Sequence, residues 1–467
     1  MQSEKIVSSF RDPGGFIFTK NGQIYRQINK SYQKNYDQAV KKGLFERLIS
    51  EKLLIPHQEV DLKFKLTNEA YKIIKPEKVK IISYPYEWCF SQLKDAALTT
   101  LKIQKIALEK GLSLKDASNY NIQFVDGRPI LIDTLSFKIY KEGQPWVAYK
   151  QFCQHFLAPL ALMSYVDVQL SKLLEIYLDG IPLSLAVKLL PLRSKLNLSL
   201  LIHLHLHSST QKKYADKPVK IHSTNKNFSK RSFLGLIDNL ESGIKSLKWA
   251  PKGTEWADYY PANNNYVEGA LKAKVELVAD FLKAAKPTSL LDVGGNTGLF
   301  SRLASDKDIP TISFDIDPAA VEINYQEMIA KNEKTILPLI LDLTNPSPAI
   351  GWKNQERSAF LQRSSADTVL ALAIIHHLAI SNNLPLETLA EFFASLCENL
   401  IIEFIPKSDS QVKKLLSTRE DIFGNYSQEG FEKEFTKFFK IKKSADIKGS
   451  KRILYLLIRN RNGKNES

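Results

Sequence analysis

The spacing of hydrophobic residues changes along the chain and indicates two parts of different architecture. In the first part, apolar residues on both sides of Asn21-Gly22 predict a β-hairpin within residues 10–28, and helical spacing follows over 31–54. The other expected elements are strands over 71–75 and 79–83, a helix over 91–110, a second hairpin over 122–132 and mostly helical chain over 146–206. Strands and helices mixed in this order predict an α+β domain.

The second part alternates between strand and helix patterns. The expected strands are 289–293, 311–314, 337–341, 368–375 and 400–404, and the expected helices are 271–285, 298–305, 318–331 and 385–397. Such alternation is typical of βαβ units that build a parallel sheet. Two last strands near 439–447 and 453–459 are expected to form an antiparallel edge pair. The predicted fold class is α/β, a Rossmann-like sheet with a reversed edge strand, preceded by the α+β domain.

Length and composition set the expected domain limits. The chain has 467 residues, about three times a typical domain of ~150 residues. Between residues 208 and 230 polar residues dominate and the apolar periodicity is lost. We therefore predict an N-terminal domain over 1–207, a linker and helical connector over 208–254, and a second domain over 255–460.

Charge and cysteine content narrow the class of protein. The 65 Lys and Arg residues exceed the 50 Asp and Glu residues, and a net charge of +15 favours anionic partners without selecting one. Cys89, Cys153 and Cys397 are too scattered for a disulfide framework or a paired-cysteine metal site. The start lacks a signal-peptide pattern, and the longest apolar run, 156–163, is too short for a membrane helix. We expect a cytoplasmic protein without a membrane span.

A glycine-rich turn follows the first strand of the second part. Residues 290–298 read Leu-Leu-Asp-Val-Gly-Gly-Asn-Thr-Gly, with an acidic residue near the strand end and glycines after it. Glycines let the backbone approach a ligand closely, which suits a nucleotide-like molecule. Asp315 ends the next strand and Asp342 ends the third. Three successive strands thus end in aspartate at the sheet edge where open α/β sheets bind ligands.

These motifs resemble those of the class I S-adenosylmethionine-dependent methyltransferases. The resemblance covers about residues 255–460, although Asn296 replaces the middle glycine of the first motif. It implies S-adenosylmethionine as the cofactor, Asp315 as the ribose ligand and Asp342 on the adenine side. It also implies that the aromatic segment 256–266 covers the cofactor. The expected cofactor-binding residues are Asp292, Gly294, Gly295, Asn296, Gly298, Asp315 and Asp342.

His376 and His377 follow the fourth strand, at the edge where a methyl acceptor would lie. A neutral imidazole can take a proton from a hydroxyl, so His377 is the candidate base. Paired histidines at this place also occur in such methyltransferases as part of the cofactor pocket. The Asn/Asp-Pro-Pro-aromatic motif of amino-group methylation is missing here, which favours an oxygen acceptor. Glu403, near the end of the fifth strand, is expected either to orient the substrate or to be a solvated or capping carboxylate.

Three residues of the first part resemble the catalytic loop of kinase-like phosphotransferases. Asp116 and Asn121 have the spacing of that loop, and Asp133 follows a hairpin as the metal-binding aspartate does. The match is incomplete, because Thr134-Leu135 stands where the family has Phe-Gly. The resemblance implies a kinase-like fold that serves acceptor recognition, and the sequence leaves open whether this domain transfers phosphoryl groups. An α+β domain with these residues in ordinary turns stays open as the alternative.

We predict a class I S-adenosylmethionine-dependent methyltransferase that acts on an oxygen of a small molecule or a glycan. Two alternatives stay open: an RNA methyltransferase, supported by the net charge, and a non-catalytic cofactor-binding protein with a pseudokinase-like domain. No metal site is predicted, because the alternating His203, His205 and His207 fit the polar face of a helix. The basic residues over 442–443 and 448–452 are expected on a solvated sheet edge.

Overall fold

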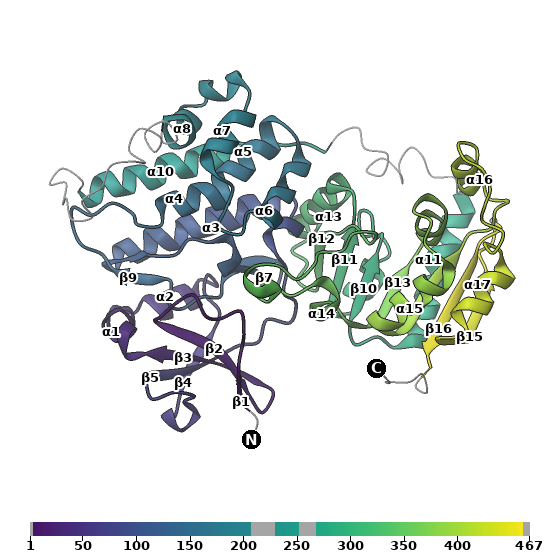
Figure 1. The fold of residues 1–467 in the computed structure, drawn as a ribbon, viewed down its shortest axis with the longest axis horizontal. Helices are drawn as coiled ribbons and strands as arrows, with labels where there is room; N and C mark the ends of the chain where they lie inside the picture. The colour runs from purple at the N-terminus through teal and green to yellow at the C-terminus, as the bar shows by residue number, and fades with distance from the viewer. Residues whose placement is uncertain (1–2, 207–228, 252–267, 461–467) are drawn as a thin grey trace. The chain divides into compact units, whose positions relative to one another are not determined.

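The computed structural model describes residues 3–206, 229–251 and 268–460 (Figure 1). The expected linker 208–230 and the aromatic segment 256–266 lie wholly or almost wholly outside the described residues. The chain divides into two compact units. The first comprises 1–250 and 349–357, and the second comprises 251–348 and 358–467. The chain therefore passes between the units after residues 250, 348 and 357.

An antiparallel sheet opens the first unit, in the order β1-β2-β3-β5-β4. Its strands are β1 (Ser3–Lys5), β2 (Gly15–Lys20), β3 (Gln23–Asn29), β4 (His57–Val60) and β5 (Ala70–Pro76). The expected hairpin is present, because Asn21 and Gly22 both take a positive φ, of 52° and 73°, and reverse the chain between β2 and β3. Phe16, Phe18 and Tyr25 pack together on one face of this sheet.

Helices and two strand pairs complete the first unit. The long helix α3 (Phe90–Glu109) is largely buried and contacts α10 (Lys230–Ser246). The pairs are β6 (Leu112–Leu114) with β9 (Phe137–Ile139), and the expected hairpin of β7 (Ile122–Val125) with β8 (Arg128–Leu131). The other α-helices among the described residues of this unit are α1 (Gln33–Lys41), α2 (Leu44–Ser50), α4 (Tyr149–Phe152), α5 (Ala158–Tyr165), α6 (Leu173–Ile176), α7 (Leu183–Leu189) and α8 (Leu198–Leu200).

One strand expected in the first part is wrong. Residues 79–83 form no strand, although their alternation of apolar and polar residues favours one. The backbone N–H of Ser83 donates to the side-chain oxygen of Gln123 at 2.9 Å, and the Gln123 amide donates to the Ser83 carbonyl at 2.9 Å. A glutamine side chain therefore takes the place of a partner strand.

A seven-stranded sheet forms the second unit, in the order β12-β11-β10-β13-β14-β16-β15. Its strands are β10 (Leu290–Val293), β11 (Thr311–Asp315), β12 (Ile336–Ile340), β13 (Ala366–Ala371), β14 (Cys397–Phe404), β15 (Phe439–Asp446) and β16 (Ile453–Arg459). The first five strands of that order run parallel, and β16 is antiparallel to both β14 and β15. The predicted α/β fold and the antiparallel pairing of its last two strands are confirmed. The reversed strand is β16, which lies next to the edge, whereas the edge strand β15 runs parallel to β14.

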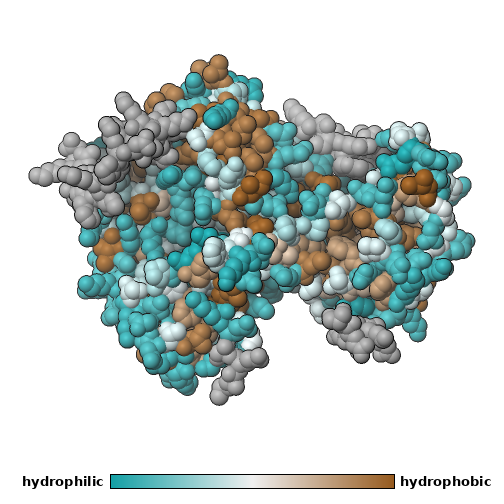
Figure 2. Space-filling view, in the orientation of Figure 1, coloured by the Kyte–Doolittle hydropathy of each residue, from teal (hydrophilic) through white to brown (hydrophobic). Residues whose placement is uncertain are grey.

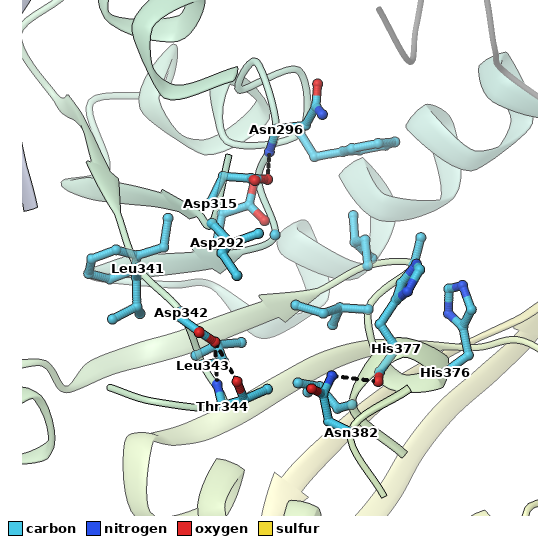
Figure 3. Close-up of a pocket in the computed structure, with 18 of the residues that line it drawn as sticks. Asp292, Asn296, Asp315, Leu341, Asp342, Leu343, Thr344, His376, His377 and Asn382 are labelled. Carbon is cyan, nitrogen blue, oxygen red and sulfur yellow. Dashed lines mark hydrogen bonds between the residues drawn. The ribbon is translucent and has the colours of Figure 1, made fainter. Parts of the chain in front are cut away.

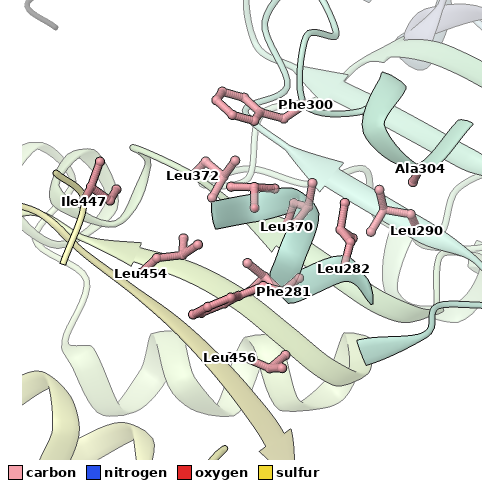
Figure 4. Close-up of a cluster of buried hydrophobic side chains, with 12 residues drawn as sticks. Phe281, Leu282, Leu290, Phe300, Ala304, Leu370, Leu372, Ile447, Leu454 and Leu456 are labelled. Carbon is pink, nitrogen blue, oxygen red and sulfur yellow. The ribbon is translucent and has the colours of Figure 1, made fainter. Parts of the chain in front are cut away.

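Helices cover this sheet and enclose its core. They are α11 (Glu268–Ala285), α12 (Arg302–Ser305), α13 (Pro318–Ala330), α14 (Phe360–Arg363), α15 (Leu386–Leu396), α16 (Ser410–Leu416) and α17 (Gln428–Phe435). Phe281 and Leu282 of α11 pack with Leu290, Leu370 and other apolar side chains of the central strands (Figure 4). This cluster fixes the strand ends from which the site is built.

Two elements of the second unit are shorter than expected. The helix expected over 298–305 is regular only over Arg302–Ser305, because Gly298 takes a φ of 85°, which a right-handed helix excludes. The strand expected over 368–375 ends at Ala371, and Ala373 turns the chain with a φ of 52°. The first residues of the expected helix and the last residues of the expected strand therefore form loops at the same edge of the sheet.

Surface polarity matches a protein with large buried cores. Hydrophilic side chains cover most of the face seen in Figure 2, and hydrophobic ones appear in scattered groups. Within the described ranges, no helix is long and apolar enough to cross a bilayer. Cys89, Cys153 and Cys397 are all buried as free thiols.

Candidate functional site

The turn after β10 is held against the neighbouring strand by its own backbone. The N–H groups of Gly294 and Gly295 both donate to the carbonyl of Phe314, at 2.9 and 2.8 Å. A Cβ at position 295 would clash with the Ser313 hydroxyl and lie 3.2 Å from the Asp292 carboxylate. Asn296, which replaces a glycine of the expected motif, takes a φ of 49°, a conformation that asparagine tolerates. The sequence folds this way because small residues stand where the backbone meets β11.

Two buried carboxylates lie beside this turn. The N–H of Asn296 donates to one oxygen of Asp315 at 2.8 Å, and the N–H of Asp317 donates to the other at 2.9 Å. The Ser301 hydroxyl donates to Asp292 at 2.6 Å. Burial is the main cause that raises the pKa of Asp315 to about 6, and burial with the nearby Asp315 charge raises the pKa of Asp292 to about 6. Both groups are poised to titrate near neutral pH.

A cavity of about 290 Å³ opens at this sheet edge (Figure 3). The predicted residues among those that line it are Asp292, Gly294, Asn296, Asp315, Asp342 and His377. Gly295 and Gly298 do not line it, and their place is within the turn that supports it. Asp342 lies beyond the end of β12 and accepts the N–H and the hydroxyl of Thr344, at 2.8 and 2.6 Å. The structure therefore brings the three aspartates to one cavity.

The cavity continues to the two histidines. Their rings lie 4.1 Å apart between centroids, on the side of the cavity away from Asp315 (Figure 3). His376 is 2% exposed, and neither ring nitrogen has a hydrogen-bond partner among the described residues. Burial holds the pKa of His376 well below its usual range, and the charges of His377, Arg452 and Lys274 lower it further. Only His377 was predicted from the sequence as a catalytic residue, but the early end of β13 brings His376 to the cavity as well.

A buried ion network that was not predicted from the sequence lies at the histidine side of the cavity. Lys274 of α11 pairs with Glu403 at 2.6 Å, and Arg452 contacts Glu403 at 3.4 Å and Asp409 at 2.9 Å. Lys274 and Arg452 line the cavity, whereas Glu403 is fully buried. The expectation of a solvated edge was therefore wrong for Arg452, which is 3% exposed. A lysine within an amphipathic helix gives no sequence signal for such a role.

The two aspartates of the kinase-like motif, Asp116 and Asp133, are paired with protein groups. Arg26 of β3 and the Ser136 hydroxyl both bind Asp133. Burial disfavours the charge of Asp133, but the Arg26 charge and the Ser136 hydrogen bond hold its pKa below the usual value. Asp116 accepts from the Ser118 N–H at 3.0 Å and from Gln151 at 2.8 Å. Among the described residues, no group of three His, Cys, Asp or Glu side chains could hold a metal ion.

Two of the alternating histidines take part in structural hydrogen bonds. His203 contacts the Tyr149 hydroxyl at 2.7 Å and the Asn239 side chain at 2.9 Å, and His205 contacts Ser194 at 2.9 Å. Both lie in a π-helical turn, Leu201–Leu206, rather than in a regular helix. His207 lies outside the described residues.

Part of the chain is similar to solved structures of methyltransferases. Solved structures similar to the chain include magnesium protoporphyrin IX methyltransferase (ChlM) from Synechocystis PCC 6803 with bound SAH, at 19% identity over 41% of this chain and 84% of that one, with a TM-score of 0.29. Another is the N-methyltransferase NodS from Bradyrhizobium japonicum WM9, at 12% identity over 41% and 97%, also with a TM-score of 0.29.

Similarity over the whole chain is found with a curated protein. No model of a known protein family matches the sequence. The nodulation protein NoeA of Rhizobium meliloti (strain 1021) is 36% identical over 458 residues, which cover 97% of this chain and 95% of that protein. Because this similarity includes both units, the chain belongs to the family of the nodulation protein NoeA.

Proposed function

We propose that the protein transfers a methyl group from S-adenosylmethionine to an oxygen of a small molecule or a glycan. The observation that carries this proposal is the cavity in which Asp292, Asp315 and Asp342 meet a pair of histidines. The acceptor class rests on the same cavity and on the missing amino-group methylation motif. The cofactor supplies an electrophilic methyl group when it is bound.

Each cofactor-side residue has a distinct task in this proposal. Asp315 accepts hydrogen bonds from the two ribose hydroxyls, because its oxygens are fixed by two backbone N–H groups and face the cavity. Gly294 and Asn296 bring the backbone close to the ligand. Asp342 lies two residues beyond β12, where its carboxylate or the backbone beside it can reach the adenine amino group.

The acceptor side is assigned to the histidines. His377 is half-buried and remains the candidate base that takes the hydroxyl proton. His376 is held neutral by burial and by the cations behind it, so it can accept a hydrogen bond from the acceptor hydroxyl and orient it. Lys274 and Arg452 of the buried ion network line the same cavity as both rings.

Calorimetry with S-adenosylhomocysteine tests the cofactor site. Wild-type protein is expected to bind, and Asp315→Ala to lose roughly 1.5–3 kcal/mol, because a charged hydrogen-bonding group is removed from a buried site. Asp306→Ala is the matched control, since Asp306 is exposed and does not line the cavity. Equal affinity of the wild type and Asp315→Ala would contradict the ribose assignment.

Incubation with methyl-labelled cofactor in a cell extract tests the acceptor class. Label is expected in a small molecule or a glycan, and label in RNA would contradict the proposed acceptor. With the labelled acceptor in hand, His377→Ala should keep its affinity for S-adenosylhomocysteine and transfer methyl groups more slowly. Full activity of His377→Ala would move the base assignment away from this residue.

A further inference from the structure

We propose that the first unit carries a binding site for a neutral oligosaccharide, at a cavity formed around residues 349–357. The cavity measures about 550 Å³, a size suited to a ligand of a few sugar rings. It is lined by residues of the chain's beginning, of the turn after α4, of the end of α6 and the loop after it, and of the segment 349–357, all of which belong to the first unit. None of them lines the cavity of the second unit.

The segment 349–357 is a tightly wound loop that presents a tryptophan. Ile350 and Arg357 close it with two backbone hydrogen bonds of 3.1 Å. Between them Gly351, Lys353 and Asn354 all take positive φ, of 86°, 57° and 56°. Left-handed conformations are unfavourable for residues with a Cβ, and clusters of them are typical of functional sites.

Anchors on both sides hold this strained loop in place. Glu356 is buried and binds the Arg11 guanidinium with both oxygens. It also accepts a hydrogen bond of 2.8 Å from the backbone N–H of Trp352. The Arg357 guanidinium lies over the Tyr120 ring, 4.3 Å from its centroid. The loop is thus fixed, yet the Trp352 side chain is 65% exposed. A packing role does not explain an indole that is held out in this way.

The chemistry of the cavity suits a neutral ligand with many hydroxyl groups. Trp352 and Ile176, which is 71% exposed, offer apolar surface to the C–H face of a sugar ring. Gln154 and Asp179 offer amide and carboxylate groups to hydroxyls. The lining cations, Arg11 and Lys353, are balanced by two lining carboxylates, so there is no surplus charge to select an ionic ligand.

This binding site is separate from the site of the proposed methyl transfer, and it can be tested without measuring methyl transfer. A glycan acceptor held here would be the same class of molecule that the second unit is proposed to methylate. Failure of sugar binding and failure of cofactor binding are separate measurements on the same full-length protein.

Calorimetry with cellotetraose, maltotetraose and tetra-N-acetylchitotetraose tests the proposal. At least one of these neutral probes should bind the wild-type protein, and Trp352→Ala should weaken that binding at least about tenfold, because a central aromatic contact is removed. Trp352→Phe should restore part of the affinity. Leu196→Ala is the control, since Leu196 is 89% exposed and lies outside the cavity.

Three results would overturn the proposal. These are no binding of any of the three probes, equal affinity of Trp352→Ala and wild type, or binding only of an anionic probe such as tetragalacturonate. Affinity of Trp352→Ala for S-adenosylhomocysteine, measured in parallel, should stay at the wild-type value and so shows that the variant is folded.

Discussion

In the proposed function, Asp315 is the residue on which cofactor recognition depends most directly. Both of its oxygens already accept a backbone N–H, and each ribose hydroxyl needs a further lone pair. A protonated carboxyl has fewer acceptor sites than a carboxylate, so the charged form is the one expected to bind. Burial raises the pKa of Asp315 to about 6, so the ligand-free protein gains a proton at this group as the pH falls through that value.

Cofactor affinity should therefore depend on pH around this value. Below about pH 6 the free protein must lose a proton to bind, so the affinity for S-adenosylhomocysteine should fall by up to about tenfold per pH unit as the pH drops. Above about pH 7 it should be nearly constant. Calorimetry at pH 6 in buffers of different ionisation enthalpy should show net proton release on binding. Constant affinity between pH 5 and 7 without proton release would contradict this role.

The glycine turn shows at the level of an element why particular residues are small. Gly295→Ala should destabilise the protein by about 1–3 kcal/mol and weaken cofactor binding, because its Cβ would push the turn away from Ser313 of β11. Gly235→Ala is the matched control: Gly235 is exposed within α10 and has free space at the Cβ position. That control should stabilise the protein by roughly 0.5–1 kcal/mol. Urea unfolding of both variants measures the difference, and equal stabilities would contradict the packing argument.

The buried ion network links α11 to the reversed end of the sheet. Lys274→Met should cost about 3 kcal/mol, because the buried Glu403 would lose its ion pair with Lys274 at 2.6 Å. The double variant Lys274→Met/Glu403→Gln should lose less than the sum of the two single variants. A double-mutant cycle by urea unfolding measures this coupling, and additive losses would show that the pair does not act as a unit.

Sequence patterns predicted the elements well where the local signal and the tertiary contacts agree. The hairpin at Asn21-Gly22 and the alternation from β10 to β14 were recovered, because turn chemistry and periodicity decide them locally. The strand over 79–83 was wrong, because a distant glutamine satisfies the Ser83 backbone. Convergence of the three aspartates was predictable from strand order, but the roles of Lys274 and Arg452 were not, since long-range pairing decides them.

At the scale of the whole molecule, the connection between β12 and β13 belongs to both units. Asp342 and Thr344 line the cavity of the second unit, and only residues 345–348 separate them from the loop 349–357 of the first unit. That loop is anchored by Arg11 at Glu356 and by Tyr120 at Arg357. A connection of four residues is short, because an extended residue spans at most about 3.6 Å.

Cofactor binding should therefore slow hydrogen exchange beyond the cavity. With S-adenosylhomocysteine bound, amides of 341–344 and of the loop 349–357 should both exchange more slowly, since ordering one end of the connection restricts the other. Glu356→Gln weakens the anchor at Arg11, so it should speed exchange in the loop and reduce the protection that the ligand confers there. Mass spectrometry of peptides from these segments measures both effects. Protection of 341–344 with unchanged exchange in 349–357 would show that the two sites act independently.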